Sequence, residues 1–259
     1  MKKLLMLGII SFALFTTSCN NDDSGNSNDT ATLELRLTDG PADYEEINLD
    51  VQAVEIKMNG ETMDFPINNP GIFNILELNN GVDVLLGNAV LPVGQISQIR
   101  LILGEDNTIN VNGEIHPLDT PSAQQSGLKI NVHYEFEPGM VYKVWLDFDA
   151  GKSIVERGNG TYGLKPVLRA YTELTNGMIE GHVLPLEAMT TVYALQNVQD
   201  TIAVAIPEPN GYFRFSGMEE GTYRLKFDAE NESFQDQELN DVNVTFGSVT
   251  NVGEIILVP

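Results

Sequence analysis

Short segments in which apolar and polar residues alternate make up most of the chain from residue 32 onward. Leu33, Leu35 and Leu37 alternate with polar neighbours, and the segments 128–136 and 142–149 repeat the pattern. Successive side chains of a β-strand point to opposite faces, so a period of two predicts half-buried strands. No convincing helical period persists beyond three turns. The pattern therefore predicts an all-β protein with antiparallel sheets.

Two local signals sharpen this expectation. The alternation in 47–56 changes phase near Gln52–Ala53, which predicts a β-bulge. Asn112–Gly113 lies between apolar residues, and this dipeptide is typical of a tight hairpin turn. Pro- and Gly-rich breaks between the segments fit a β-sandwich.

The strands fall into two groups. The chain of 259 residues is long enough for two domains of ordinary size. We expect a first β-sandwich over 32–172 and a second over 177–259, in tandem. With a single cysteine in the chain, no intramolecular disulfide can form, so apolar cores must stabilise both units.

The second unit carries a specific series of motifs. Its segments are Gly177 to Val183, Asn210-Gly211-Tyr212-Phe213, Gly221-Thr222-Tyr223 and the closing Val242 to Leu257. In this order they resemble the carboxypeptidase regulatory-like domain, a small seven-strand sandwich of transthyretin type. The resemblance implies a structural or interaction module without catalytic residues.

The first unit also has recognisable segments. They are Leu35-Arg36-Leu37-Thr38-Asp39-Gly40-Pro41-Ala42, Val54-Glu55-Ile56, Asp147-Phe148-Asp149-Ala150, Lys152-Ser153-Ile154-Val155, Tyr162 and Leu164-Lys165-Pro166-Val167. Together they resemble an uncharacterised family of bacterial lipoprotein domains, domain of unknown function 4382. This resemblance implies architecture and location but no activity.

The N-terminus has the features of a secretory signal over residues 1–18. Lys2 and Lys3 precede an apolar run and a short stretch of small residues. The run is too short for a membrane-spanning helix, which needs about 20 residues. Cys19, the only cysteine, follows directly, and the segment resembles a bacterial lipoprotein signal in which this residue carries the lipid. The alternative is an ordinary secretory signal followed by an unpaired thiol.

Residues 19–31 contain no large apolar side chain and are expected to form a flexible, lipidated tether. Asp22–Asp23 resembles the acidic signals that direct some lipoproteins to the outer face of the cell. These two residues are equally explained as ordinary tether residues. We expect an outer-membrane lipoprotein of the cell envelope, with surface exposure left open.

The charge of the chain argues against binding to nucleic acids and to anionic membrane surfaces. The formal net charge is −23, and removal of Lys2 and Lys3 with the signal leaves −25. Such a chain repels nucleic-acid backbones and anionic membrane surfaces. Membrane attachment is therefore expected to depend on the lipid anchor.

One row of side chains is a candidate ligand site. If Val144, Leu146 and Phe148 face the core, then Trp145, Asp147 and Asp149 lie on the opposite face. An exposed Trp beside carboxylates can stack on a sugar ring and bind its hydroxyls. The alternative is a solvated face whose Trp is covered by a loop or by the second domain. Catalysis by the carboxylates is disfavoured, because no apolar pocket that would raise a pKa is evident.

A second candidate is the acidic loop that contains Asp39 and Asp43. These carboxylates could bind calcium, which takes six to eight oxygen ligands, but simple turn chemistry also explains them. The three histidines show no zinc spacing, and the motifs of common nucleophilic enzymes and of nucleotide binding are absent. No cofactor is expected, with calcium left open.

Three functions remain in order of preference. The first is a non-enzymatic, lipid-anchored module that binds a glycan or envelope proteins. The second is a calcium-stabilised adhesion or scaffold protein. The third is a glycan hydrolase, which would need a deep cleft with a desolvated carboxylate.

Overall fold

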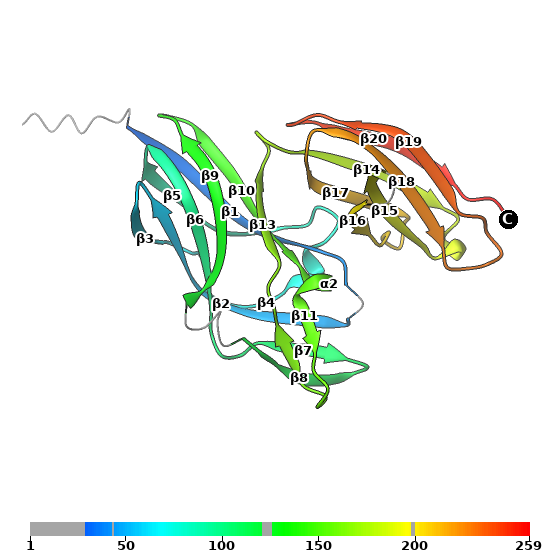
Figure 1. Ribbon diagram of the computed structural model, residues 1–259, viewed down its shortest axis with the longest axis horizontal. Helices are drawn as coiled ribbons and strands as arrows, with labels where there is room; N and C mark the ends of the chain where they lie inside the picture. Colours follow the sequence, from blue (N-terminus) through cyan, green and yellow to red (C-terminus); the bar gives the residue numbers. More distant parts are fainter. Residues whose placement is uncertain (1–28, 43, 121–125, 198–199) are drawn as a thin grey trace, which may run out of the picture.

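The computed structural model describes residues 29–42, 44–120, 126–197 and 200–259 (Figure 1). The signal segment, Cys19, nearly all of the tether and Asp43 lie outside the described residues. In the described part, strands dominate and the helical elements are single turns: η1 Ile75–Leu78, α2 Ala150–Ser153 and η2 Leu186–Ala188. This part of the protein is therefore almost entirely β, as the alternating pattern predicts.

A four-stranded sheet forms one layer of the first unit, in the order β13-β10-β1-β5. Its strands are β1 Thr30–Gly40, β5 Val84–Pro92, β10 Val141–Asp149 and β13 Leu168–Thr172. The leucines at 33, 35 and 37 of β1 are fully buried, because one face of this sheet covers the core.

A nine-stranded sheet forms the opposite layer, in the order β11-β12-β8-β7-β2-β6-β9, with β3 and β4 also paired to β2. Its strands are β2 Glu46–Met58, β3 Glu61–Phe65, β4 Gly71–Asn74, β6 Gly94–Leu103, β7 Thr108–Val111, β8 Glu114–Asp119, β9 Leu128–Phe136, β11 Ile154–Glu156 and β12 Tyr162–Leu164.

Both local predictions for this sheet are confirmed. The register between β2 and β6 shifts between Val51 and Ala53, where the bulge was expected. Asn112 and Gly113 connect β7 to β8 with φ of 53° and 79°. Positive φ at both central residues is the requirement of a type I′ hairpin turn.

The second unit is a smaller sandwich. Its sheets have the orders β17-β14-β20 and β16-β15-β18-β19. The strands are β14 Gly177–Leu184, β15 Thr190–Gln196, β16 Asp200–Ala205, β17 Tyr212–Met218, β18 Gly221–Ala229, β19 Gln237–Val244 and β20 Val249–Ile256. Edge-to-face contacts join the rings of Phe213, Phe215 and Phe227 in its core.

Most strand pairs are antiparallel, but three are parallel. These are β1 with β10, β8 with β12, and β14 with β20. In each pair the two strands are distant in sequence, and alternation within a strand carries no information about the direction of its neighbour. The parallel β1–β10 pair brings Gly40 beside Asp149, so the ends of both strands meet at one edge of the unit.

Each unit has its own apolar core. One cluster of buried side chains extends from Ala31 to Leu164, and the other from Ile179 to Leu257. Trp145 and Tyr171 are buried but belong to neither cluster. Figure 1 shows the second unit beside β13, with β16 at the junction. Independent folding of 177–259 stays a prediction.

Candidate binding cavity between the two units

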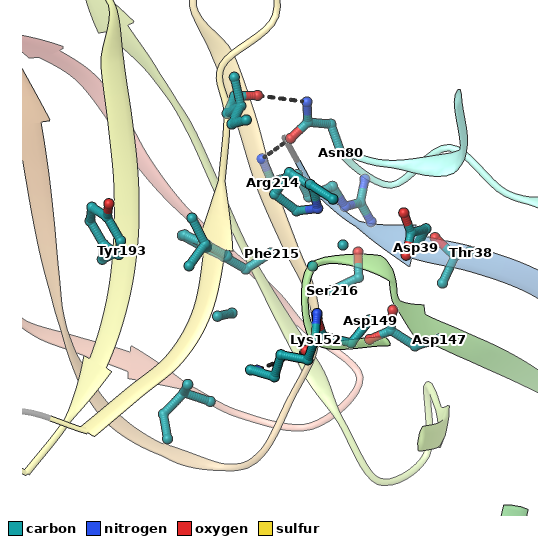
Figure 2. Close-up of a pocket in the computed structure, with 18 of the residues that line it drawn as sticks. Thr38, Asp39, Asn80, Asp147, Asp149, Lys152, Tyr193, Arg214, Phe215 and Ser216 are labelled. Carbon is teal, nitrogen blue, oxygen red and sulfur yellow. Dashed lines mark hydrogen bonds and ion pairs between the residues drawn. The ribbon is translucent and has the colours of Figure 1, made fainter. Parts of the chain in front are cut away.

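The two units are joined by direct contacts between their backbones and polar side chains. The Asn80 side-chain amide donates to Ile206 O at 3.1 Å, and its carbonyl oxygen accepts from Arg214 N at 3.4 Å. Both groups of one amide thus bind backbone atoms of the other unit (Figure 2). Such a two-point contact fixes both distance and orientation.

Arg169 makes the second contact across the junction. Its Nη1 and Nη2 donate to Gly217 O and Ser216 O, each at 3.2 Å, while its Nε donates to Asp147 at 2.6 Å. The guanidinium therefore forms hydrogen bonds to both units at once. Its several N–H donors in one plane make this possible.

A cavity of about 620 Å³ lies at this junction. Figure 2 shows Asp39, Asp147, Asp149 and Lys152 on the side of the first unit, with Tyr193 and Phe215 on the side of the second. The volume falls within the range of about 300–1,000 Å³ that is typical of small-ligand sites, and such sites occur preferentially between domains.

Trp145 does not form an exposed platform, so the ligand-site hypothesis is wrong for this residue, and the alternative of a Trp that is covered from solvent holds. The residue is only 8% exposed, and its ring stacks on Tyr171 with centroids 5.4 Å apart and planes 5° from parallel. Its Nε1 donates to Asp83 at 2.8 Å, and Asp83 also pairs with Arg36. Alternation placed Trp145 correctly on the face away from the core. On that face the ring of Tyr171, from the neighbouring strand β13, packs against Trp145, and Tyr171 in turn contacts Gly217 of the second unit.

Asp147 and Asp149 both line the cavity, as two members of the predicted row. Asp147 is paired with Arg169. Asp149 accepts from Lys152 N at 3.0 Å and from Lys152 Nζ at 2.7 Å, so it caps the short turn α2. Each carboxylate therefore has a cationic partner, and the wall that they form is close to neutral.

Asp39 is the most unusual group of this wall. It lies at the end of β1, where it is 7% exposed, and its Oδ1 accepts from Ala150 N at 3.0 Å. Its Oδ2 is buried and finds no hydrogen-bond partner in the described part of the chain. Burial, opposed by amide hydrogen bonds and reinforced by the charges of Asp147 and Asp149, raises the pKa of Asp39 to about 9. The carboxyl is therefore protonated at neutral pH.

The calcium hypothesis gains no ligand set from these residues. Asp43, the partner proposed for Asp39, lies outside the described residues. Across the ranges that the structure describes, no group of three or more His, Cys, Asp or Glu side chains is arranged to hold a metal ion. Calcium binding stays an untested prediction.

The second unit supplies a wall that sequence analysis missed. Thr191 and Tyr193 of β15 and Thr201–Val204 of β16 line the cavity. No sequence signal places these strands opposite β10, because the contact depends on how the two sandwiches dock. Arg169 could have been predicted from the sequence. It lies in a short strand that follows the Asp147 segment, where it is adjacent to the apolar residue Leu168 and therefore points to the opposite face of the sheet.

Nothing in the described residues of the cavity combines a nucleophile with a base. Asp39 is protonated, and its free oxygen is closed to solvent. Asp147 and Asp149 are held by cations. The arrangement is suited to binding a neutral or mixed polar and apolar ligand. In the same ranges, no helix is long and apolar enough to cross a membrane.

Three solved structures to which the chain is similar are all distant from it in sequence. A minor pilin of Streptococcus agalactiae is 11% identical, with 87% of this chain and 96% of that chain covered and a TM-score of 0.24. A fimbrial protein of Bacteroides ovatus is 9% identical, with 88% and 50% covered and a TM-score of 0.27. A type II cohesin-X-dockerin complex of Acetivibrio cellulolyticus is 20% identical over 31% of this chain, with 56% of the matched chain covered and a TM-score of 0.25. At these scores the likeness carries no functional argument.

No curated protein matches the chain. One family model does match, over residues 30–166, and its description is a domain of unknown function, DUF4382. The match ends before the second unit, whose resemblance to the carboxypeptidase regulatory-like domain stays a prediction. Because the matched residues make up more than half of the chain, the protein belongs to the DUF4382 family.

Proposed function

We propose that this protein is a lipid-anchored, non-enzymatic binding module of the cell envelope, and that its ligand occupies the cavity between the two units. The observation that carries the proposal is the cavity itself, about 620 Å³ in volume and lined by both units. The anchor is inferred from the signal segment and Cys19. The ligand classes to be tested are glycans and polypeptides of the cell envelope.

The junction supports this proposal because it is held by specific contacts. Asn80 and Arg169 bond to backbone atoms of the second unit, so the cavity walls are fixed before a ligand arrives. A preorganised site binds more tightly, since less conformational entropy is lost on binding. Paired charges line the first wall, while Tyr193 and Ile202 supply apolar surface on the second.

The test is a binding screen on the soluble mature chain, residues 20–259. A panel of envelope oligosaccharides and linear peptides is assayed for an increase in melting temperature, because a ligand that binds the folded state stabilises it. Thr201→Trp should fill part of the cavity and abolish the increase. Thr62→Trp, at an exposed position of β3 away from the cavity, is the matched control and should leave it intact. Equal increases in both variants would contradict the proposal.

A second candidate, a glycan hydrolase, is favoured by one observation: a protonated Asp39 beside two further carboxylates is the pattern of a general acid. We place it second because the free oxygen of Asp39 is closed to solvent and both neighbours are paired with cations. Release of reducing ends from envelope polysaccharides, abolished by Asp39→Asn, would reverse this order.

A further inference from the structure

The strand β16 lies at the edge of its sheet. Among the described residues it pairs with β15 alone, in the sheet order β16-β15-β18-β19. In an antiparallel pair, alternate residues of an edge strand direct their N–H and C=O groups away from the partner. The second side of β16 therefore presents a row of backbone donors and acceptors.

This free edge faces the cavity. Four consecutive residues of β16, Thr201–Val204, line the cavity. A strand that presents one face contributes every second residue, as β15 does with Thr191 and Tyr193. The register with β15 shifts at Ile202, so alternation is interrupted there and resumes at Ala203 and Val204. Because these two consecutive residues both line the cavity, the backbone edge of β16 is exposed to it, along with the face that β16 shares with Tyr193.

The side chains beside this edge are apolar. Val204 is opposite Tyr193 in the register of β15 and β16, and Ile202 is 36% exposed. Natural proteins usually protect an exposed edge with lysine, proline, inward-pointing charges or a β-bulge. Of these devices β16 has a bulge, because its register with β15 shifts at Ile202. Residues 200–205 contain a single charged residue, Asp200 at the start, and no proline. On the C-terminal side of the bulge, the edge therefore has no charged residue or proline that would block pairing where it meets the cavity.

Charge restricts the occupant further. The acidic residues of the first wall are protonated or paired with cations. Of the other charged residues in the lining, Glu230 is acidic and Arg214 is basic. The lining is therefore close to balanced, but Asp200 begins β16 and the mature chain carries −25 overall. This overall charge disfavours an acidic occupant, so a neutral or basic one is favoured.

We propose that the ligand of this cavity is an extended polypeptide segment, neutral or basic and with alternating apolar side chains, that adds as a further strand to the free edge of β16. The inference rests on the proposed function and names the ligand class of the same site. Residues 201–204 span about 13 Å, so three to four residues of the segment pair with the edge. Main-chain hydrogen bonds would supply affinity, and contacts with Tyr193 and Ile202 would select the side chains.

The experiment begins with a display library of linear peptides about ten residues long, selected on residues 20–259. Each selected peptide is then synthesised in two N-methylated forms, in which alternate amides of one register or of the other are blocked. Strand addition predicts that one register loses about 10–100-fold in affinity while the other changes by less than about threefold. The backbone amides of 200–205 should also become protected from hydrogen exchange.

A variant of the edge strand and a matched control test the position of the bound peptide. Ile202→Glu places a charge beside the free edge and should abolish peptide binding. Ile115→Glu changes an equally apolar residue of β8 that is 68% exposed and remote from the cavity, and it should bind as the unmodified chain does.

The remaining outcomes separate this inference from the proposed function. Equal losses in both methylation registers, or protection outside β16, would overturn strand addition. An oligosaccharide that binds the cavity when no peptide does would also overturn it and would leave the proposed function standing. If neither class binds the cavity, both proposals are wrong.

Discussion

The ring of Tyr171 lies so close to the backbone of Gly217 that a Cβ atom at residue 217 would stand 2.5 Å from Tyr171 Cδ1. Tyr171 belongs to β13 of the first unit, and Gly217 belongs to β17 of the second. This contact sets how closely the two sandwiches approach, and so it helps to define the cavity between them.

Gly217→Ala is expected to destabilise the folded chain by about 1–3 kcal/mol, because the new methyl group collides with the ring. Gly217 also has a φ of +66°, which disfavours any other residue. Gly253→Ala separates the two effects: its φ is +75°, but a Cβ there meets nothing within 4 Å. Chemical denaturation should show a larger loss at 217 than at 253. Equal losses at the two positions would mean that the contact with Tyr171 does not affect the free energy of unfolding.

Asp39 is expected to make stability depend on pH. Its pKa is about 9 in the folded chain against 3.8 for the ordinary group, so the folded state holds a proton that the unfolded state releases. The contribution of Asp39 to the free energy of unfolding is therefore fully present below pH 3.8. It falls as the pH rises from 3.8 toward 9, and it no longer changes above pH 9. The limiting slope is about 1.4 kcal/mol per pH unit.

Asp39→Asn should remove this slope and should exceed the unmodified chain in stability at pH 8 by more than about 1 kcal/mol. Urea unfolding at a series of pH values measures both effects. Asp64→Asn, at an exposed position of β3, is the control and should leave the slope unchanged. A slope that persists in Asp39→Asn would show that another group carries it.

Trp145 is expected to behave as a packing residue. Trp145→Ala should lower the free energy of unfolding by about 3–5 kcal/mol, because a large buried ring is lost. Trp145→Phe keeps a ring against Tyr171 but loses the donor to Asp83, and it should cost about 1 kcal/mol. Phe246→Ala, at an aromatic residue that is 57% exposed, should change stability by less than about 0.5 kcal/mol. A negligible effect of Trp145→Ala on the free energy of unfolding would contradict this packing role.

Membrane attachment is expected to depend on Cys19. The signal segment ends at this residue, and the strongly acidic chain is repelled by anionic lipid headgroups. Cys19→Ala should therefore release the protein from the membrane fraction or block its processing, as fractionation and immunoblotting would reveal. A processed variant that stays in the membrane fraction would rule out the lipid anchor.

Sequence patterns predicted the local structure well, because alternation, bulges and hairpin turns depend on neighbouring residues. The bulge near Ala53 and the turn at Asn112–Gly113 are examples. The parallel pairing of β1 with β10 was missed, since it joins segments that are far apart in the chain. The site was predicted only in part. Alternation along one strand identified Asp147 and Asp149, and both line the cavity. The burial of Trp145 and the wall formed by β16 depend on contacts between segments that are far apart in the chain, so neither was predicted.

Binding of a ligand in the cavity between the two units can be measured directly by cysteine protection. The mature chain without Cys19 has no other cysteine, so Thr201→Cys and Thr62→Cys each introduce a single reactive thiol, one in the cavity and one on β3. A panel member that raises the melting temperature is predicted to slow maleimide labelling of the thiol at 201 and to leave labelling at 62 unchanged. Unchanged labelling at 201 in the presence of such a ligand would contradict binding in the cavity.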